Sequence, residues 1–195
     1  MRDGATIYFI RHGETDWNAE RRYQGQHDIP LNDTGRAQAR RNGEILRTFL
    51  PALAEADFVA SPLLRACETM RIVRAALGLP DEGFRIDDRL KELHYGHWEG
   101  VLATDLPTVD PEGLAARHKD PFRWRPRGGE SFAELTARIA PWLDEVERPT
   151  VVTSHGGVGR ALRGYILGLE PTLVTQLDMP QDKVLVLKRD GVSWL

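Results

Sequence analysis

The chain has 195 residues and a formal net charge of −3, because 26 basic residues nearly balance 29 acidic ones. That balance gives no general electrostatic case for binding nucleic acid. Cys67 is the only cysteine, which excludes a disulfide framework and a cysteine-rich metal site. The apolar run at residues 7–10 is too short for a membrane span or a signal-peptide core. We therefore expect a soluble, cytoplasmic protein that folds as a single domain over residues 1–195.

The first predicted elements are a buried strand at residues 7–10 and a helix from residue 34 to about residue 50. Asn32 or Asp33 can cap that helix, and Pro51 can stop it. The strand is followed directly by Arg11, His12 and Gly13. Polar residues therefore follow the first strand.

The next strand is predicted at residues 58–60, and a helix follows it as far as Leu77. Ser61 is expected to cap this helix, and Pro62 suits its first position. Residues 85–90 are predicted as a third strand.

Residues 93–130 contain many glycines and prolines and are expected to form an irregular segment that caps the substrate site. The remaining predicted elements are a helix near 111–118, a helix from the Ser131 cap to about 146 that contains Pro141, a strand at 150–153, a helix at 158–167 and a hairpin formed by 184–187 and 192–195.

Strands that alternate with helices predict an α/β fold. We expect a three-layer sandwich, with a largely parallel central sheet and helices on both faces. In such sheets ligands bind at the carboxyl ends of the strands. Both the strand at 7–10 and the strand at 150–153 are followed by a histidine and a glycine. A site is therefore expected at that edge.

Four segments at strand ends or helix starts can bring complementary groups to this edge: residues 11–15, 61–65, 91–96 and 154–157. Together they supply two imidazoles, two guanidinium groups and a carboxyl group. Guanidinium groups bind phosphate oxygens in a bidentate manner, and neutral imidazole is a nucleophile near neutral pH. A protonated carboxyl group can donate to a leaving oxygen. This set covers the needs of phosphoryl transfer without a metal ion.

The ordered motifs make the sequence similar to a known family, the histidine phosphatase superfamily, which includes the cofactor-dependent phosphoglycerate mutases. They are Arg11-His12-Gly13-Glu14-Thr15 with Asp16-Trp17-Asn18, Gln24-Gly25, Asp28-Ile29-Pro30-Leu31, Thr34-Gly35-Arg36-Ala37-Gln38-Ala39, Ser61-Pro62 with Arg65-Ala66 and Glu68-Thr69, Glu92 with Tyr95-Gly96 and Trp98-Glu99-Gly100, Gly128-Gly129-Glu130-Ser131, and Ser154-His155-Gly156-Gly157. The resemblance implies a phosphoglycerate mutase-like fold.

The resemblance also implies roles for single residues. His12 would become phosphorylated, and Glu92 would be the proton donor. The phosphate pocket would be formed by Arg11, Arg65 and His155. Further contacts to phosphate or substrate are expected from Asn18, Gln24, Gly25, Tyr95 and Gly156.

Two activities of this family are considered. The resemblance implies that a mutase would carry an insertion after the proton-donor segment and a C-terminal tail that covers the site. Here the stretch between Glu92 and Gly128 is short and no tail follows the hairpin that ends at Leu195, so we favour a phosphatase that hydrolyses small phosphate monoesters. The alternative is phosphoglycerate mutase-type phosphoryl transfer, which would need a bisphosphorylated primer, whereas the phosphatase needs no cofactor. Arg123, Arg125 and Arg127 could bind a second acidic group, although a solvated basic loop is the favoured interpretation.

Three other classes compete with this interpretation. A metal hydrolase could use His94 and His97, but no metal-binding histidine or cysteine motif is present. A serine hydrolase at Ser154 lacks the Gly-x-Ser-x-Gly elbow. A non-catalytic binding module is disfavoured because both His12 and Glu92 are present. The expected partner is a small-molecule phosphate ester, with no nucleic acid or membrane, and a homodimer is left open.

Overall fold

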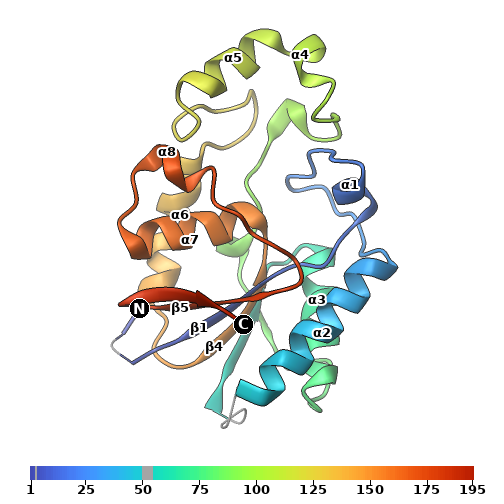
Figure 1. The fold of residues 1–195 in the computed structure, drawn as a ribbon, viewed down its shortest axis with the longest axis vertical. Helices are drawn as coiled ribbons and strands as arrows, with labels where there is room; N and C mark the ends of the chain where they lie inside the picture. The colour runs from blue at the N-terminus through green and yellow to red at the C-terminus, as the bar shows by residue number, and fades with distance from the viewer. Residues whose placement is uncertain (3, 50–54) are drawn as a thin grey trace.

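A six-stranded sheet lies between two layers of helices in the computed structural model, which describes residues 1–2, 4–49 and 55–195 (Figure 1). The strand order is β3-β2-β4-β1-β5-β6. The parallel strands are β1 (Ile7–Arg11), β2 (Asp57–Ala60), β3 (Arg85–Ile86) and β4 (Thr150–Ser154), and an antiparallel hairpin of β5 (Val184–Lys188) and β6 (Gly191–Trp194) extends the sheet beside β1. The predicted α/β class, with a largely parallel sheet, is confirmed.

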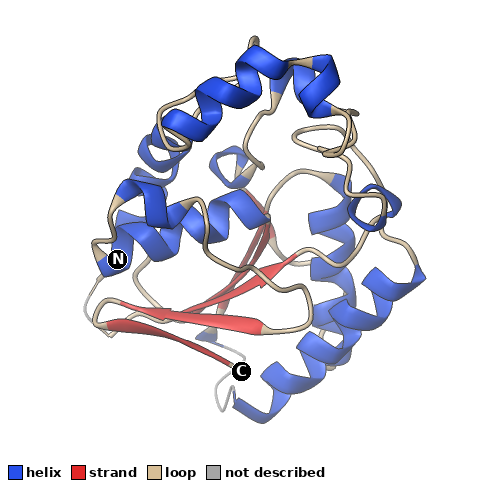
Figure 2. Cartoon of the chain, turned by 45° about the horizontal axis from the view of Figure 1, so that its top comes forward, coloured by secondary structure: helices blue, strands red, loops and turns tan. Residues whose placement is uncertain are grey.

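Alternate residues of each strand point to opposite faces of the sheet, so the two faces have separate cores. Ile7 and Phe9 pack in the core formed with α6 (Phe132–Asp144) and α7 (Gly156–Leu167). Ile10 packs in the other core, with residues of α2 (Asp33–Phe49) and α3 (Leu64–Ala76). Helices therefore cover both faces, as Figure 2 also shows.

The segment expected to be irregular contains two short helices, α4 (Leu106–Val109) and α5 (Pro111–Lys119), and α5 matches the predicted helix. Figure 1 shows both helices at one end of the molecule, away from the sheet. The sequence prediction also lacks α4 and the short elements α1 (Asp16–Ala19), α8 (Pro171–Val174) and the 3-10 turns η2 (Asp88–Leu90) and η3 (Gly96–Trp98).

The predicted strand at residues 85–90 is wrong in its second half. Only Arg85 and Ile86 pair with β2. The Asp87 side chain accepts a hydrogen bond from the backbone N–H of Arg89, at 2.9 Å, and caps η2. That local bond replaces strand pairing and turns the chain toward Glu92.

The predicted start of α3 is also wrong. The cap residue is Leu63, not Ser61, and it makes no side-chain capping bond. The backbone N–H of Leu64 instead donates to Asp28 Oδ1, at 2.6 Å. Ser61 Oγ is 2.7 Å from Nε2 of His155. The hydroxyl group therefore serves the site instead of the helix.

Other helix boundaries agree more closely with the sequence. Asn32 accepts a hydrogen bond from the Gly35 N–H, at 2.9 Å, at the start of α2, and the proposed stop at Pro51 lies outside the described residues. A capping box of Ser131 and Glu134 begins α6. Helix α7 begins at Gly156, two residues earlier than predicted.

Strands β1 and β4 place the site, because they pair in parallel with Arg11 opposite Ser154. The residues that follow, His12 and His155, therefore leave the sheet side by side. Ser61 follows the end of β2, and its N–H donates to the Thr153 carbonyl at 3.0 Å. Among the described residues, no helix has the length and apolar character needed to cross a lipid bilayer.

We expect Gly35→Ala to destabilise the protein, although alanine normally favours a helix by roughly 0.5–1 kcal/mol over glycine. A Cβ atom at Gly35 would overlap with the backbone of Glu14, which cannot yield as a flexible side chain would. Such overpacking costs typically about 1–3 kcal/mol. Urea denaturation measures the change. Arg41→Ala, on the exposed side of the same helix, is the control, and an unchanged or higher stability of Gly35→Ala would contradict the packing argument.

Candidate active site

Two buried imidazoles occupy the carboxyl end of the sheet. The ring centroids of His12 and His155 are 5.1 Å apart, and both side chains are almost fully buried. Each histidine directly follows one of the two neighbouring parallel strands. The structure therefore brings together residues that are 143 positions apart in the sequence.

His12 is held with one ring nitrogen toward the pocket. Its Nδ1 is 2.7 Å from the carbonyl oxygen of Gly13, which can only accept, so Nδ1 carries the proton. Burial and the nearby Arg65 and Arg11 lower the pKa of His12 well below its ordinary value of 6.5. The imidazole is therefore neutral near pH 7, and the lone pair of its Nε2 accepts a hydrogen bond from Arg65 Nε, at 3.2 Å.

Arg65 is a fully buried cation without a carboxylate ligand. Its Nη1 and Nη2 donate to the carbonyl oxygens of His27 (2.6 Å) and Gly25 (2.7 Å), and its Nε donates to Nε2 of His12 (3.2 Å). Burial lowers its pKa to about 10, so the guanidinium group stays charged at neutral pH. A buried positive charge of this kind favours binding of an anion.

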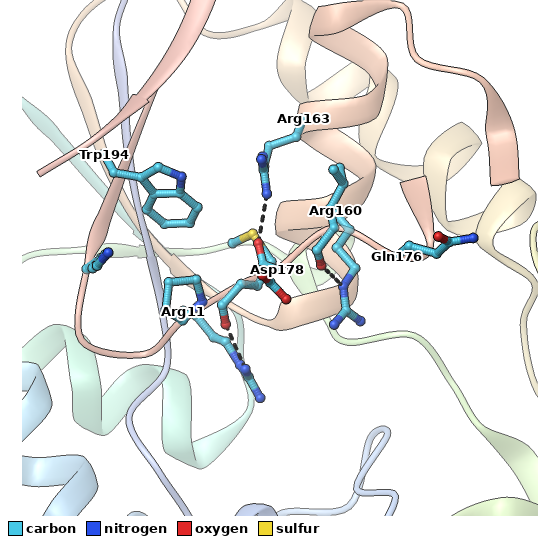
Figure 3. Close-up of a pocket in the computed structure, with 10 residues that line it drawn as sticks. Arg11, Arg160, Arg163, Gln176, Asp178 and Trp194 are labelled. Atoms are coloured by element: carbon cyan, nitrogen blue, oxygen red, sulfur yellow. Dashed lines mark hydrogen bonds between the residues drawn. The ribbon is translucent and has the colours of Figure 1, made fainter. Parts of the chain in front are cut away.

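Arg11 lies on the other side of His12 and is also incompletely paired. Its Nη1 donates to the carbonyl oxygen of Met179 at 2.7 Å, as drawn in Figure 3. Its Nε is buried without a hydrogen-bond partner among the described residues. Burial lowers the pKa of Arg11, and the carboxyl group of Glu92 opposes that shift.

His155 also has an unsatisfied nitrogen. Its Nδ1 is buried without a partner within the described part of the chain. Burial, Arg65 and His12 lower the pKa of His155 well below 6.5, so the free protein holds it neutral. It can therefore contribute a hydrogen bond, but not a full positive charge, to a bound anion.

Glu92 faces the pocket from the segment after η2. Its Oε1 accepts hydrogen bonds from the N–H groups of Leu93 (2.8 Å) and Gly157 (3.0 Å). Gly157 belongs to the first turn of α7, so the start of this helix orients the Glu92 carboxyl group. A Cβ atom at Gly157 would overlap with Oε1, which explains why glycine suits this position.

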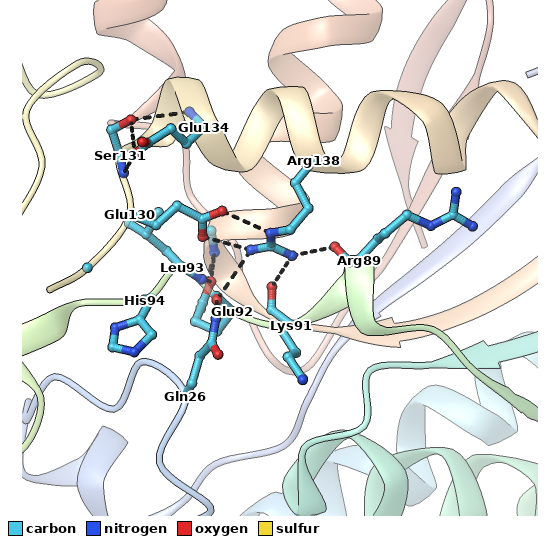
Figure 4. A network of polar contacts seen from close by, with 12 residues as sticks. Gln26, Arg89, Lys91, Glu92, Leu93, His94, Glu130, Ser131, Glu134 and Arg138 are labelled. Atoms are coloured by element: carbon cyan, nitrogen blue, oxygen red, sulfur yellow. Dashed lines mark hydrogen bonds and ion pairs between the residues drawn. The ribbon is translucent and has the colours of Figure 1, made fainter.

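A partly buried ion pair fixes the backbone that carries Glu92 (Figure 4). Arg138 of α6 binds both carboxyl oxygens of Glu130, at 2.8 and 2.9 Å. The same guanidinium group donates to the carbonyl oxygens of Arg89, Lys91 (3.1 Å) and Glu92 (3.5 Å). Arg138 therefore holds this stretch in place from behind the site.

The pocket in front of His12 has a volume of about 140 Å³. Every residue predicted for the site lines it, except His155, whose ring is 5.1 Å from that of His12. The lining residues are Arg11, His12, Asn18, Arg22, Tyr23, Gln24, Gly25, Arg65, Glu92, Tyr95, Gly156 and Arg160. The sequence prediction did not include Arg22 and Arg160. The position of Arg160, one helical turn after His155 and Gly156, is the signal that could have identified it.

Glu99 fixes one wall of the pocket. Its Oε1 accepts hydrogen bonds from the backbone N–H groups of Gln26 (3.1 Å) and Tyr95 (3.0 Å), which joins the loop at 24–27 to η3. Gly25 lies against this carboxylate with φ +52°, where an added Cβ would collide with it. Burial raises the pKa of Tyr95 to about 12, so its phenol stays protonated.

The competing candidates lie outside this pocket. His97 contacts Asp110 at 2.8 Å, and His94 accepts a hydrogen bond from the Gly96 N–H at 2.9 Å. Within the described residues, no group of three or more His, Cys, Asp or Glu side chains could hold a metal ion. Arg123 and Arg125 form exposed ion pairs with Asp120 and Glu134. The loop that carries these arginines is therefore solvated, which is the interpretation favoured from the sequence.

The fold and this set of residues define a histidine phosphatase. The family model of the histidine phosphatase superfamily (branch 1) matches residues 7–195, and the chain belongs to this family.

Its relatives include both activities considered from the sequence. A glucosyl-3-phosphoglycerate phosphatase of Mycolicibacterium vanbaalenii is 35% identical over 84% of this chain and 74% of its own length. A 2,3-bisphosphoglycerate-dependent phosphoglycerate mutase of Gloeobacter violaceus is 31% identical over 90% and 81%. The structure of a mycobacterial glucosyl-3-phosphoglycerate phosphatase in complex with VO₃ superposes with a TM-score of 0.80, at 30% identity over 97% and 96% of the two chains.

The two buried histidines predict how stability depends on pH. The unfolded chain binds protons near the ordinary pKa of 6.5, while the folded chain holds both imidazoles neutral. The free energy of unfolding should therefore fall as the pH drops below about 6.5, by up to about 1.4 kcal/mol per pH unit for each histidine.

Urea denaturation between pH 7.5 and 5.5 measures this slope. We expect the double variant His12→Asn, His155→Asn to flatten it, and His118→Asn, exposed on α5, to retain it. A wild-type protein that is equally stable at pH 7 and pH 5.5 would contradict the assignment of neutral buried imidazoles.

Proposed function

We propose that the chain is a phosphatase that hydrolyses small phosphate monoesters through a phosphohistidine at His12, with no metal ion or cofactor. The observation that carries this proposal is the state of His12: a neutral imidazole with Nδ1 fixed on Gly13 and Nε2 beside the charged Arg65. Such an imidazole is a nucleophile at neutral pH, and the cation beside it attracts the phosphoryl group.

In the first step the phosphoryl group enters between Arg11 and Arg65. A phosphate oxygen there would satisfy the two unpaired buried nitrogens, Arg11 Nε and His155 Nδ1. His12 Nε2 attacks phosphorus, the bond to the ester oxygen breaks, and Glu92 gives that oxygen a proton. The N–H groups of Leu93 and Gly157 then stabilise the carboxylate that remains.

In the second step water replaces the alcohol. The Glu92 carboxylate takes a proton from water as the water oxygen attacks phosphorus. The phosphorus–nitrogen bond breaks, phosphate leaves, and His12 and protonated Glu92 are restored. The guanidinium groups supply the positive charge that a metal ion would otherwise provide, so we expect activity to survive EDTA.

The relatives support this family of activities but include a mutase, so phosphoglycerate mutase-type transfer is the second candidate. The two differ in the acceptor of the phosphoryl group, which is water or a bound acid. Release of inorganic phosphate from p-nitrophenyl phosphate and other monoesters supports the phosphatase. Interconversion of phosphoglycerates that depends on a bisphosphorylated primer would support the mutase.

We predict that His12→Ala abolishes both the phosphoenzyme and turnover, because His12 is the only imidazole among the described residues that line this pocket. Incubation with a radiolabelled phosphate ester, followed by quenching in alkali, preserves phosphohistidine for detection. Thermal unfolding of the variant controls for folding. A His12→Ala protein that retained the wild-type rate would overturn the mechanism.

We predict that Arg138→Met slows hydrolysis of alkyl phosphates about 10- to 100-fold, because it releases the backbone that aims Glu92. The loss for p-nitrophenyl phosphate should be smaller, since its leaving group needs little protonation. Glu92→Gln should show the same pattern.

Arg125→Met is the matched control. This exposed arginine also donates a hydrogen bond to a backbone carbonyl oxygen, that of Gly129, at 2.8 Å, next to Glu130. Equal losses for alkyl and nitrophenyl esters in Arg138→Met would indicate general damage to the fold and would contradict a positioning role.

A further inference from the structure

Ser61 contacts the second buried imidazole of the site, that of His155. Its hydroxyl oxygen is 2.7 Å from Nε2 of the ring, and both side chains are fully buried. A neutral imidazole carries one proton, so the hydrogen bond between these two atoms uses either the hydroxyl proton or the ring proton. If the hydroxyl group donates, the ring proton is on Nδ1, and if the ring donates, Nδ1 holds a lone pair.

The other partner of the hydroxyl group favours donation by Ser61. Its Oγ accepts a hydrogen bond from the backbone N–H of Leu63, at 3.4 Å. Within residues 1–2, 4–49 and 55–195, this N–H and the ring of His155 are its hydrogen-bond partners. Because an N–H group cannot accept, the hydroxyl proton has a single acceptor, Nε2 of His155. A ring that donated instead would leave the hydroxyl proton buried without a partner, which is costly.

The opposite side of the ring leads to the same arrangement. Nδ1 of His155 is buried and has no hydrogen-bond partner among the described residues. The ring is 5.1 Å from that of His12, close enough for an oxygen of the proposed phosphoryl group to contact it. Such an oxygen accepts hydrogen bonds. A proton on Nδ1 can be donated to it, whereas a lone pair on Nδ1 would repel it.

The sheet holds the two partners in register. Strands β2 and β4 pair in parallel with Ala60 opposite Thr153, and Ser61 and His155 follow close behind these residues. The N–H of Ser61 donates to the Thr153 carbonyl oxygen at 3.0 Å, and its own carbonyl oxygen accepts a hydrogen bond from Sγ of Cys67 at 3.2 Å. Both backbone groups of Ser61 are therefore fixed, and its hydroxyl group is directed by the same pairing that places the imidazole.

We propose that Ser61 is a positioning residue whose hydroxyl group donates to Nε2 of His155 and keeps the ring proton on Nδ1, from which it is donated to a phosphoryl oxygen of the substrate. This role rests on the proposed hydrolysis at His12, but the tautomer of His155 is a property of the free protein. Both imidazoles then carry their proton on Nδ1 and have opposite tasks. His12 turns its unprotonated Nε2 to phosphorus, and His155 turns its N–H group to oxygen.

Long-range ¹H–¹⁵N NMR spectra of the free protein at neutral pH test the tautomer directly. The protonated and unprotonated nitrogens of a neutral imidazole have different ¹⁵N chemical shifts, and the signals missing in His155→Asn identify this residue. We expect Nδ1 of His155 to carry the proton in the wild type. A ring protonated at Nε2 would overturn the proposal, and this measurement needs no variant of Ser61 that folds.

Ser61→Ala tests the consequence for catalysis. We expect kcat/KM for p-nitrophenyl phosphate to fall about 10- to 100-fold, the effect of one hydrogen bond to a charged group. Inhibition by inorganic phosphate should weaken, and His155 should show signals of the Nε2-protonated tautomer. Thr153→Val is the matched control, because it removes an equally buried hydroxyl group at the same edge of the sheet, one that donates to the Ala66 carbonyl oxygen at 2.9 Å. Its kcat/KM should stay within about threefold of wild type, with an unchanged tautomer.

Thermal unfolding shows whether each variant is folded. Equal losses of kcat/KM in folded Ser61→Ala and Thr153→Val, with the wild-type tautomer in both, would reduce Ser61 to a packing role and overturn the proposal. A folded Ser61→Ala protein with the wild-type rate would do the same. A wild-type protein that hydrolyses no phosphate monoester would instead overturn the proposed function, while the NMR spectra would still decide which atom of His155 the Ser61 hydroxyl group protects from protonation.

Discussion

The parallel pairing of β1 and β4 is the constraint on which the site depends. Their register puts Arg11 opposite Ser154, so the next residue of each strand, His12 and His155, emerges beside its neighbour. A slip by one residue would turn every side chain of the strand to the other face of the sheet. Because both strands are buried on both faces, such a slip would place Ile7 and Phe9 in the wrong core. Stability of the core and geometry of the site therefore select the same register.

Burial of positive charge gives this site its chemistry. Arg65 is fully buried and is held by two carbonyl oxygens and a ring nitrogen, none of which carries a full negative charge. Burial, together with this positive charge, keeps His12 and His155 neutral, and the charge attracts an anion. Under the proposed function, these two causes prepare both the nucleophile and the binding site for phosphate. This arrangement also explains why the free energy of unfolding should fall at low pH, because protonated imidazoles would add positive charge to a region that is already positively charged.

The fold class, and most residues of the pocket in front of His12, could be predicted from the sequence. The buried strands are apolar runs, and the histidines that follow them belong to ordered motifs that span the chain. Boundaries set by tertiary contacts could not be predicted. Asp28, in a distant loop, accepts a hydrogen bond from the first N–H of α3, while the Ser61 hydroxyl contacts His155. No local sequence pattern signals these two contacts. Glu130 stood in a recognisable motif, but its partner Arg138 became apparent only in the structure.

The sequence by itself determined an α/β fold, the candidate residues of the pocket and the superfamily, because these depend on apolar periodicity and on motifs that are local in the chain. Only the tertiary structure decided the protonation of His12, the support behind Glu92 and the contact between Ser61 and His155. Those properties depend on burial, on the direction of hydrogen bonds and on charges brought together from distant segments. Side-chain pKa values and the shape of a pocket are collective properties of the packed chain, so residue types alone do not fix them.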